Sequence, residues 1–454
     1  MPKGPANIRV DDMDSDLPAE LVHFFEKGGK SLLIKGSAGA GKTTLALTLL
    51  RAFNITENFL YVSTRESPVQ FLRDNAWIAE RFGGHGAILQ KKQPDPNSDS
   101  TILDGFVDAR LDEPTQLFER ITGKLMDASA PFIIIDSWDA MQDFADNKEL
   151  KTNARVLQTW AGRAEATLVF TMGDPNNAAL DELVEGVLVL KQRNVESRRL
   201  RELTISKLYG VKIENPSYFF TLNDAEFRSF RHYRPEDLVI GPVPPNAKAS
   251  RGTNTVSAGS FPMGYPKLDL ALGGGIPAGS VQSVEVDSEV NMKIPFLLIA
   301  RLITSFAQHG DLVRLYPLRG LDRDFVAEFL GVSVPKSCTK RVRMPESPEE
   351  GMEEKIAAGT KVLSILNFHG EKEESLRYFS DLARSSRGVT IYVGKKWKSE
   401  DAFGNVSAIA ASRMKITYTN GTLFLQSKIP FSQFYGLTVN RRMGIPEIEL
   451  EPMV

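Results

Sequence analysis

Short runs of β-branched and aromatic residues alternate with longer amphipathic stretches along the first half of the chain. The runs SLLIK, NFLYVS, PFIIID, ATLVFTM, GVLVLK and RELTISK predict strands at 31–35, 58–63, 131–136, 166–172, 186–191 and 201–207. Residues 43–53, 69–82, 114–127 and 153–164 have the periodicity of amphipathic helices. Because the strands are apolar almost throughout, the pattern predicts an α/β fold: a mostly parallel sheet with helices on both faces.

The second half repeats this order. Its apolar runs predict strands at 280–287, 311–317, 361–368, 388–394, 413–419 and 422–428, and helices at 294–308 and 322–331. The tails of the two series also match in outline, ISKLYGVKIENP against FSQFYGLTVNRR. The pattern indicates an internal duplication of one α/β unit.

A stretch between the two series lacks sustained periodicity. Residues 234–264 are rich in Pro, Gly, Ser, Thr and Asn, a composition typical of a linker. A chain of 454 residues is also too long for one ordinary core. We therefore expect a first domain at 1–235, a linker at 236–260 and a second domain at 261–454.

Composition and charge narrow the class of protein. Apolar residues make up 42% of the chain and charged residues 25%, which is typical of a globular protein. No apolar run approaches the length of a membrane helix, the N-terminus lacks the features of a secretion signal, and Cys338 is the single cysteine. We expect a cytoplasmic protein without membrane association. The five histidines lack metal-ligand spacing, so no zinc site is expected. A net charge of −2 provides no general attraction for nucleic acid.

The segment GSAGAGKT at 36–43 follows a predicted strand and opens a predicted helix. This is the context of a phosphate-binding loop, in which glycines allow main-chain N–H groups to approach an anion and the helix N-terminus adds its dipole. Lys42 is expected to reach the terminal phosphates and the Thr43 hydroxyl to hold Mg²⁺. The predicted nucleotide-contacting positions in and directly after this segment are Gly36, Ser37, Ala38, Gly39, Ala40, Gly41, Lys42, Thr43 and Thr44.

Two carboxylates complete the candidate site. Asp136 ends the apolar strand PFIIID, where a magnesium nucleotide site needs a carboxylate, so we predict that it faces the metal. Glu66 follows the strand NFLYVS, at the sheet edge where ligands of open α/β sheets lie. It is a candidate for the base that positions the attacking water, although an exposed loop glutamate is more often a solvated surface residue.

These motifs resemble those of the KaiC-like branch of the RecA superfamily, and within it archaeal proteins similar to the gas-vesicle regulator GvpD. In the first half the resemblance rests on IKGSAGAGKTTLALTLL, YVSTRESPVQFLRDNA, IIIDSWDAM, LDELVEGVLVL and ISKLYG, and in the second on GYPKLDLALGGGIPAGSV. It implies two tandem RecA-like domains that use ATP and Mg²⁺ and assemble into rings. It also implies that Glu66 and Lys42 are catalytic, and that Lys207 reaches a phosphate held by a neighbouring subunit.

The chain departs from the family pattern at several positions. Arg65 stands where relatives have the first glutamate of a pair, so hydrolysis is expected to be slow; the alternative is that its guanidinium reaches a phosphate. Tyr209 replaces the arginine expected after Lys207, which weakens the case for a ring. In the second half, DSEVNMKIPF lacks every loop glycine and Asn367 replaces the strand-end Asp, so this RecA-like domain is expected to be degenerate.

The basic run RRLR at 198–201 is expected to lie in a solvated strand connection, with a protein contact and then nucleic acid as the alternatives.

Three functions remain open at this point. The favoured one is a regulatory switch in which Mg-ATP bound to the first domain sets the assembly of the chain or its affinity for a protein partner. The second is a DNA-repair or recombination accessory ATPase, which the near-neutral charge argues against. The third is a nucleotide-stabilised scaffold that barely hydrolyses ATP.

Overall fold

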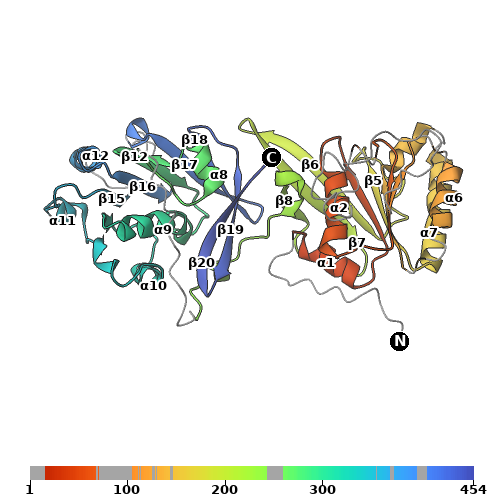
Figure 1. Ribbon diagram of the computed structural model, residues 1–454, viewed down its shortest axis with the longest axis horizontal. Coiled ribbons are helices and arrows are strands. Elements are labelled where there is room, and N and C mark those ends of the chain that lie inside the picture. Colours follow the sequence, from red (N-terminus) through yellow and green to blue (C-terminus); the bar gives the residue numbers. More distant parts are fainter. Residues whose placement is uncertain are drawn as a thin grey trace, which may run out of the picture. The chain divides into compact units, whose positions relative to one another are not determined.

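The computed structural model describes residues 16–67, 70, 105–110, 112, 114–124, 128, 130–143, 147–242, 259–353, 355–368, 373–395 and 406–454 (Figure 1). Contacts divide the chain into two units, Met1–Ser229 with Val454, and Phe230–Met453. Most of the helix predicted at 69–82 and of the linker predicted at 236–260 lies outside the described residues.

The first unit alternates strands and helices until β6 and continues with antiparallel strands. Its elements are α1 (Ala19–Glu26), β1 (Ser31–Gly36), α2 (Lys42–Ala52), β2 (Phe59–Ser63), β3 (Phe106–Asp108), α6 (Pro114–Lys124), β4 (Phe132–Asp136), η1 (Trp138–Asp143), α7 (Asn147–Arg163), β5 (Thr167–Met172), β6 (Gly186–Val195), β7 (Arg198–Leu208), β8 (Ser217–Thr221), η2 (Asn223–Ala225) and β9 (Arg228–Ser229).

One nine-stranded sheet organises this unit, in the order β3-β2-β4-β5-β1-β6-β7-β8-β9. The first six strands of this order, from β3 at the edge to β6, pair in parallel. Strands β7, β8 and β9 continue the sheet in antiparallel pairs. The antiparallel part follows from short connections, because a parallel neighbour needs a long crossover and a hairpin does not. The β6–β7 turn contains only Glu196 and Ser197, both with positive φ.

Helices cover both faces of the first sheet, as the alternation of side chains along β1 requires. Leu32 and Ile34 pack in one core with residues of α1 and α2. Leu33, between them, points to the opposite face and packs with residues of α6 and α7. Figure 1 shows the first pair of helices in red and the second in orange.

The second unit has its own helices and strands. Its elements are η3 (Pro235–Leu238), β10 (Ser260–Phe261), α8 (Pro266–Ala271), β11 (Ile276–Pro277), β12 (Ser280–Val286), α9 (Lys293–Gln308), β13 (Leu312–Leu315), α10 (Arg323–Ser333), η4 (Thr339–Arg341), β14 (Val342–Arg343), α11 (Pro348–Glu353), β15 (Val362–Asn367), α12 (Glu373–Ser386), β16 (Val389–Lys395), β17 (Ser412–Thr419), β18 (Thr422–Ile429), β19 (Tyr435–Arg442) and β20 (Ile445–Pro452).

The large sheet of the second unit has the order β14-β13-β15-β16-β12-β17-β18-β19-β20. Strand by strand, this order matches the first sheet, with β12 in the place of β1 and β18 in the place of β7. The prediction of two tandem RecA-like α/β domains is therefore confirmed.

The tail correspondence predicted between ISKLYGVKIENP and FSQFYGLTVNRR is wrong. The first string leaves β7, whereas most of the second lies in β19, which occupies the place of β8. The two strings share letters but not a position in the sheet.

Residues 230–238 pack with the second unit. Leu238 lies in the core of that unit, and the Tyr233 N–H donates to the Gly421 carbonyl at 2.7 Å. None of the helices in the described ranges combines the length and apolar character that crossing a bilayer requires.

Candidate functional site

The loop between β1 and α2 needs glycine at two close contacts. Gly41, the residue before α2, has φ 100°, and a Cβ built on it would lie 2.8 Å from Leu222 Cδ1. A Cβ on Gly36 would lie 2.8 Å from the Leu190 carbonyl oxygen. The loop therefore follows its path only because these positions lack side chains.

Lys42 begins α2 and folds its side chain back over the loop. Its Nζ donates to the Gly36 carbonyl at 2.7 Å and to the Ser37 carbonyl at 3.0 Å. Burial lowers the pKa of Lys42, and the nearby carboxylates of Asp136 and Asp139 counteract that effect. The Lys42 ammonium therefore lies against the loop between β1 and α2, whose main-chain N–H groups can face an anion.

Asp136 ends β4 and accepts three hydroxyl hydrogen bonds. Thr43 Oγ1 donates to its Oδ2 at 2.5 Å, Tyr61 Oη donates to the same oxygen at 2.7 Å, and Thr171 Oγ1 donates to Oδ1. Burial, together with the charge of Asp136, raises the pKa of Tyr61 well above its usual value, so Tyr61 remains a neutral donor. Tyr61 and Thr171 were not predicted as site residues, although both are polar residues within apolar strands.

The oxygens of Thr43 and Asp136 fit the ligand preference of Mg²⁺. They come from α2 and β4, meet at 2.5 Å, and are the hard donors that this ion binds. No group of three or more His, Cys, Asp or Glu in the described part of the chain could hold a metal by itself. A nucleotide-bound Mg²⁺ does not need such a group, because water and phosphate oxygens complete its shell.

Glu66 lies past the end of β2 and is exposed. Its backbone is held by Ser63, whose Oγ donates to the Glu66 carbonyl at 2.6 Å and accepts from the Glu66 N–H at 3.3 Å. Its charge also helps to raise the pKa of Tyr61. The role predicted for Glu66 in positioning water stays a prediction.

The arginines of the run at 198–201 lie within β7, and two of them are buried. Arg198 and Arg201 are each 5% exposed, so the expected solvated connection is wrong for both. An Nη of Arg201 donates to the carbonyl of Gly39 in the loop at 2.8 Å. Burial lowers the pKa of Arg201 to about 10, with a contribution from Arg199. Sequence reasoning missed this contact because the pairing of β6 with β7 creates it.

Lys207 is not brought to the loop. On β7, Lys207 pairs with Val187 of β6, and Val187 in turn pairs with Leu33 of β1. Lys207 therefore lies three residues along the strand before the level of Gly36, where the loop begins. Its Nζ donates to the carbonyls of Asp181 at 3.1 Å and Val184 at 2.6 Å. Contact of Lys207 with a nucleotide on a neighbouring subunit stays a prediction.

The corresponding segment of the second unit buries two apolar side chains. Between β12 and α9, Val290 and Met292 are 1% and 2% exposed and lie in the hydrophobic core. Strand β15 ends at Asn367, in the sheet position where β4 ends at Asp136. The second unit thus keeps the strand order without the glycine loop or the carboxylate.

Comparison with known proteins identifies relatives of this chain. Residues 21–206 match the family described as GvpD gas vesicle protein, P-loop domain. Protein GvpD2 of Halobacterium salinarum is 27% identical over 313 residues, which cover 66% of this chain and 61% of that protein. Protein GvpD1 of the same organism is 27% identical over 315 residues, which cover 66% of this chain and 56% of that protein.

The circadian clock oscillator protein KaiC of Prochlorococcus marinus is 23% identical over 296 residues, or 61% of this chain and 54% of that protein. The chain therefore spans between 54% and 61% of the length of these relatives. The matches confirm the resemblance: residues 21–206 match a GvpD P-loop domain, and the chain is similar to GvpD and KaiC proteins.

Proposed function

We propose that the first unit binds Mg-ATP at residues 36–43 and acts as a regulatory switch. The observation that carries this proposal is the strand–loop–helix arrangement, in which Lys42 lies over the loop carbonyls and Thr43 meets Asp136 at 2.5 Å. The matched GvpD P-loop family supports the same proposal.

The proposed roles follow from charge and position. Main-chain N–H groups of the loop and the N-terminus of α2 bind the phosphates, and Lys42 neutralises their terminal charge. Thr43 and Asp136 hold Mg²⁺, directly or through its water shell. The bound ion supplies charge neutralisation between the outer phosphates.

We expect hydrolysis to be slow. Glu66 is the carboxylate at the edge of β2 that can accept a proton from water, but its side chain is exposed. Efficient transfer requires a carboxylate held in position, and the contacts from Ser63 hold only its backbone. A nucleotide-stabilised scaffold is the second candidate function, and the arginine at position 65 favours it.

The decisive measurement compares the wild type with Lys42→Ala, and uses Lys212→Ala as a control. Lys212 is an exposed lysine that pairs with Glu214. Lys42→Ala should weaken Mg-ATP binding at least 10-fold in calorimetry, whereas Lys212→Ala should not. A wild-type protein with no affinity for nucleoside triphosphates would refute the proposed site.

The switch needs a second readout. Molecular mass in solution and affinity for a protein partner should differ between the Mg-ATP and ADP states, and Lys42→Ala should abolish the difference. Identical behaviour in both states, together with tight binding, would favour the scaffold. Phosphate release that collapses in Glu66→Gln would instead exclude the scaffold and assign the base.

A further inference from the structure

A pair of opposite charges lies beside the phosphate loop, at the carboxyl edge of the first sheet. Arg65 follows β2, Asp139 lies three residues beyond β4, and Gly173 follows β5 directly. Because Lys35 pairs with Met172, Gly173 continues level with Gly36 on the adjacent strand. Neighbouring strands lie about 4.8 Å apart, so the pair is close to the peptide that receives the Lys42 ammonium.

Asp139 is the anchored partner. One Nη of Arg65 donates to Asp139 Oδ2 at 2.9 Å, and the Gly173 N–H donates to the same oxygen at 3.1 Å. The Asp139 side chain is 14% exposed, whereas that of Arg65 is 56% exposed. A Cβ on Gly173 would lie 2.6 Å from this oxygen, so the close approach requires glycine. The arginine can leave this contact into solvent without disturbing the core.

Both charges act on Lys42. Burial, the largest effect, lowers the pKa of Lys42; Asp139 opposes that shift and Arg65 adds to it. The Arg65–Asp139 pair lies at the same sheet edge as the ammonium expected at the terminal phosphates, because Asp139 is held by Gly173 and Gly173 continues level with Gly36. A phosphate there would carry more charge than the carboxylate and would offer the paired oxygens that a guanidinium fork binds.

Resting on the proposed nucleotide site, we propose that Arg65 distinguishes a nucleoside triphosphate from a diphosphate by exchanging Asp139 for the terminal phosphate. Position 65 then senses the phosphate instead of assisting its hydrolysis. A diphosphate leaves Arg65 on Asp139, so the two bound states differ in the position of one cation.

The test is a pair of matched substitutions, Arg65→Gln and Arg110→Gln. Arg110 follows β3, the edge strand of the sheet, which three strands separate from β1; it pairs with Asp108 at 2.7 Å, and its side chain is 46% exposed. Dissociation constants are measured with Mg²⁺ for ADP and for a non-hydrolysable ATP analogue. Arg65→Gln should weaken binding of the analogue about 10-fold and change ADP affinity less than twofold, whereas Arg110→Gln should change neither.

Two further variants test the exchange itself. Asp139→Asn removes the competing charge and should tighten binding of the analogue several-fold, an effect that Arg65→Gln must abolish in the double variant. Gly173→Ala should also displace the carboxylate and act in the same direction. Thermal unfolding identifies any variant that is merely destabilised.

The outcomes separate this inference from the function on which it rests. Wild-type protein that binds neither nucleotide refutes the proposed site, and the inference with it. Wild-type binding of both nucleotides, with an Arg65→Gln variant that weakens both equally or neither, refutes the role of Arg65 alone.

Discussion

At the scale of single residues, the Asp136 carboxylate shows how the site is prepared. Its two oxygens receive hydroxyl hydrogen bonds from Thr43, Tyr61 and Thr171, which come from α2, β2 and β5. A carboxylate oriented by three separate elements cannot rotate freely. Such positioning by surrounding hydrogen bonds is what the proposed metal-binding role of Asp136 requires.

The Tyr61 hydroxyl can be removed with little change of shape. Tyr61→Phe deletes the 2.7 Å hydrogen bond to Asp136 while keeping the buried ring. We expect a loss of about 1–2 kcal/mol in the free energy of unfolding, because Asp136 Oδ2 keeps only Thr43 as donor. We also expect a several-fold weaker Mg²⁺-dependent increment in nucleotide binding. Denaturant titration and calorimetry with and without Mg²⁺ measure the two effects.

A control variant separates the hydroxyl from general weakening of the core. Tyr392 is a fully buried tyrosine on β16 of the second unit. Tyr392→Phe should leave nucleotide binding unchanged whatever it does to stability. If Tyr61→Phe retains the whole Mg²⁺-dependent increment, Tyr61 does not orient the metal ligand.

At the scale of elements, the phosphate loop requires glycine for two different reasons, a positive φ and a lack of space for a side chain. Gly39 and Gly41 both have positive φ, of 72° and 100°. A Cβ on Gly39 would meet nothing within 4 Å, whereas one on Gly41 would collide with the side chain of Leu222. The first position therefore requires a backbone conformation, and the second also requires space.

Alanine at each position should show this difference. Gly39→Ala should destabilise the protein by about 1–2 kcal/mol, the cost of a left-handed residue. Gly41→Ala should cost about 1–3 kcal/mol more, because overpacking is added. Chemical denaturation gives both values. In the Leu222→Ala background the additional cost of Gly41→Ala should shrink, and an unchanged cost would show that the collision is not the cause.

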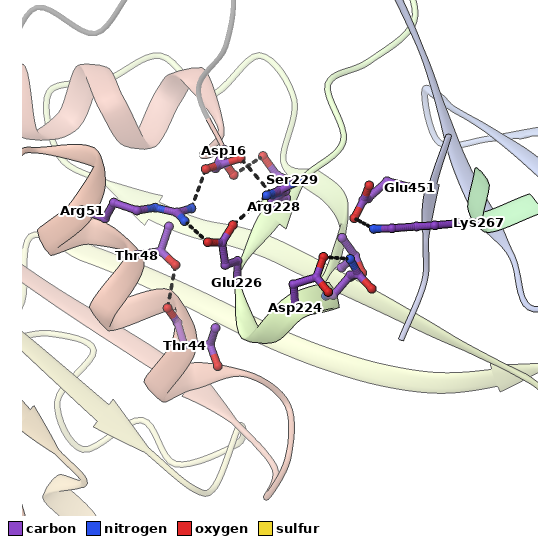
Figure 2. A network of polar contacts seen from close by, with 12 residues as sticks. Asp16, Thr44, Thr48, Arg51, Asp224, Glu226, Arg228, Ser229, Lys267 and Glu451 are labelled. Atoms are coloured by element: carbon purple, nitrogen blue, oxygen red, sulfur yellow. Dashed lines mark hydrogen bonds and ion pairs between the residues drawn. The ribbon is translucent and has the colours of Figure 1, made fainter. Parts of the chain in front are cut away.

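Ion pairs of Arg51 hold the C-terminal end of α2, as Figure 2 shows. Arg51 pairs with Asp16 at 2.6 Å and with Glu226 at 2.7 Å, and Arg228 pairs with Glu226 at 2.7 Å. The Ser229 N–H donates to the Asp16 carbonyl at 2.8 Å. Because Leu222 contacts the loop end of the same helix, the β8–β9 segment holds α2 at both ends.

Acid should weaken this attachment. Burial acts to raise the pKa of Glu226, but the hydrogen bonds and charges of Arg228 and Arg51 outweigh it and lower the pKa overall. A lowered pKa means that the ionised form stabilises the fold above the usual Glu range, and that this contribution is lost as the pH falls through the folded-state value. The stability difference between wild type and Glu226→Gln, about 1–2 kcal/mol at pH 7, should shrink below about pH 4.

The control for this prediction is Glu214→Gln. Glu214 pairs with Lys212, and their side chains are 66% and 85% exposed, so the change should be nearly neutral throughout the pH range. Urea unfolding of the three proteins between pH 3 and 8 provides the comparison. A Glu226→Gln difference that is constant over this range would contradict the role of the carboxylate charge.

At the scale of the whole molecule, two sheets of the same strand order have separate cores. Two hydrophobic clusters consist of residues of the first unit, and two others consist of residues of the second. Only the first sheet is followed by a glycine loop with its lysine, threonine and aspartate, whereas the second has Val290 and Met292 in its core at that place. The same strand order therefore occurs once with the glycine loop and once without it.

Separate cores should give two thermal transitions in calorimetry. Mg-ATP should raise only the transition of the first unit, since a ligand stabilises the unit that binds it. Leu298→Ala, at a fully buried position of α9, should lower the other transition through a loss of about 2–5 kcal/mol. Leu47→Ala in α2 should lower the transition that Mg-ATP raises. A single transition that all these changes move would show that the two units unfold as one.

The chain by itself determined six strands of each nine-stranded sheet, the duplicated α/β order, the phosphate loop and the carboxylate at the end of β4. These features depend on local periodicity and on residues adjacent in sequence, which is why they could be read without a structure. The same local reasoning misplaced the buried arginines of β7, because burial depends on parts of the chain distant in sequence, such as the Gly39 carbonyl that Arg201 contacts.

Only the tertiary structure decided which distant side chains meet. Tyr61 and Thr171 on Asp136, Arg201 on the Gly39 carbonyl, and Arg65 on Asp139 each join residues from different elements. Strand order and register bring them together, and neither is encoded in the spacing of the residues along the chain. Strand register also determines the position of Lys207, which lies level with Leu33, three residues before Gly36.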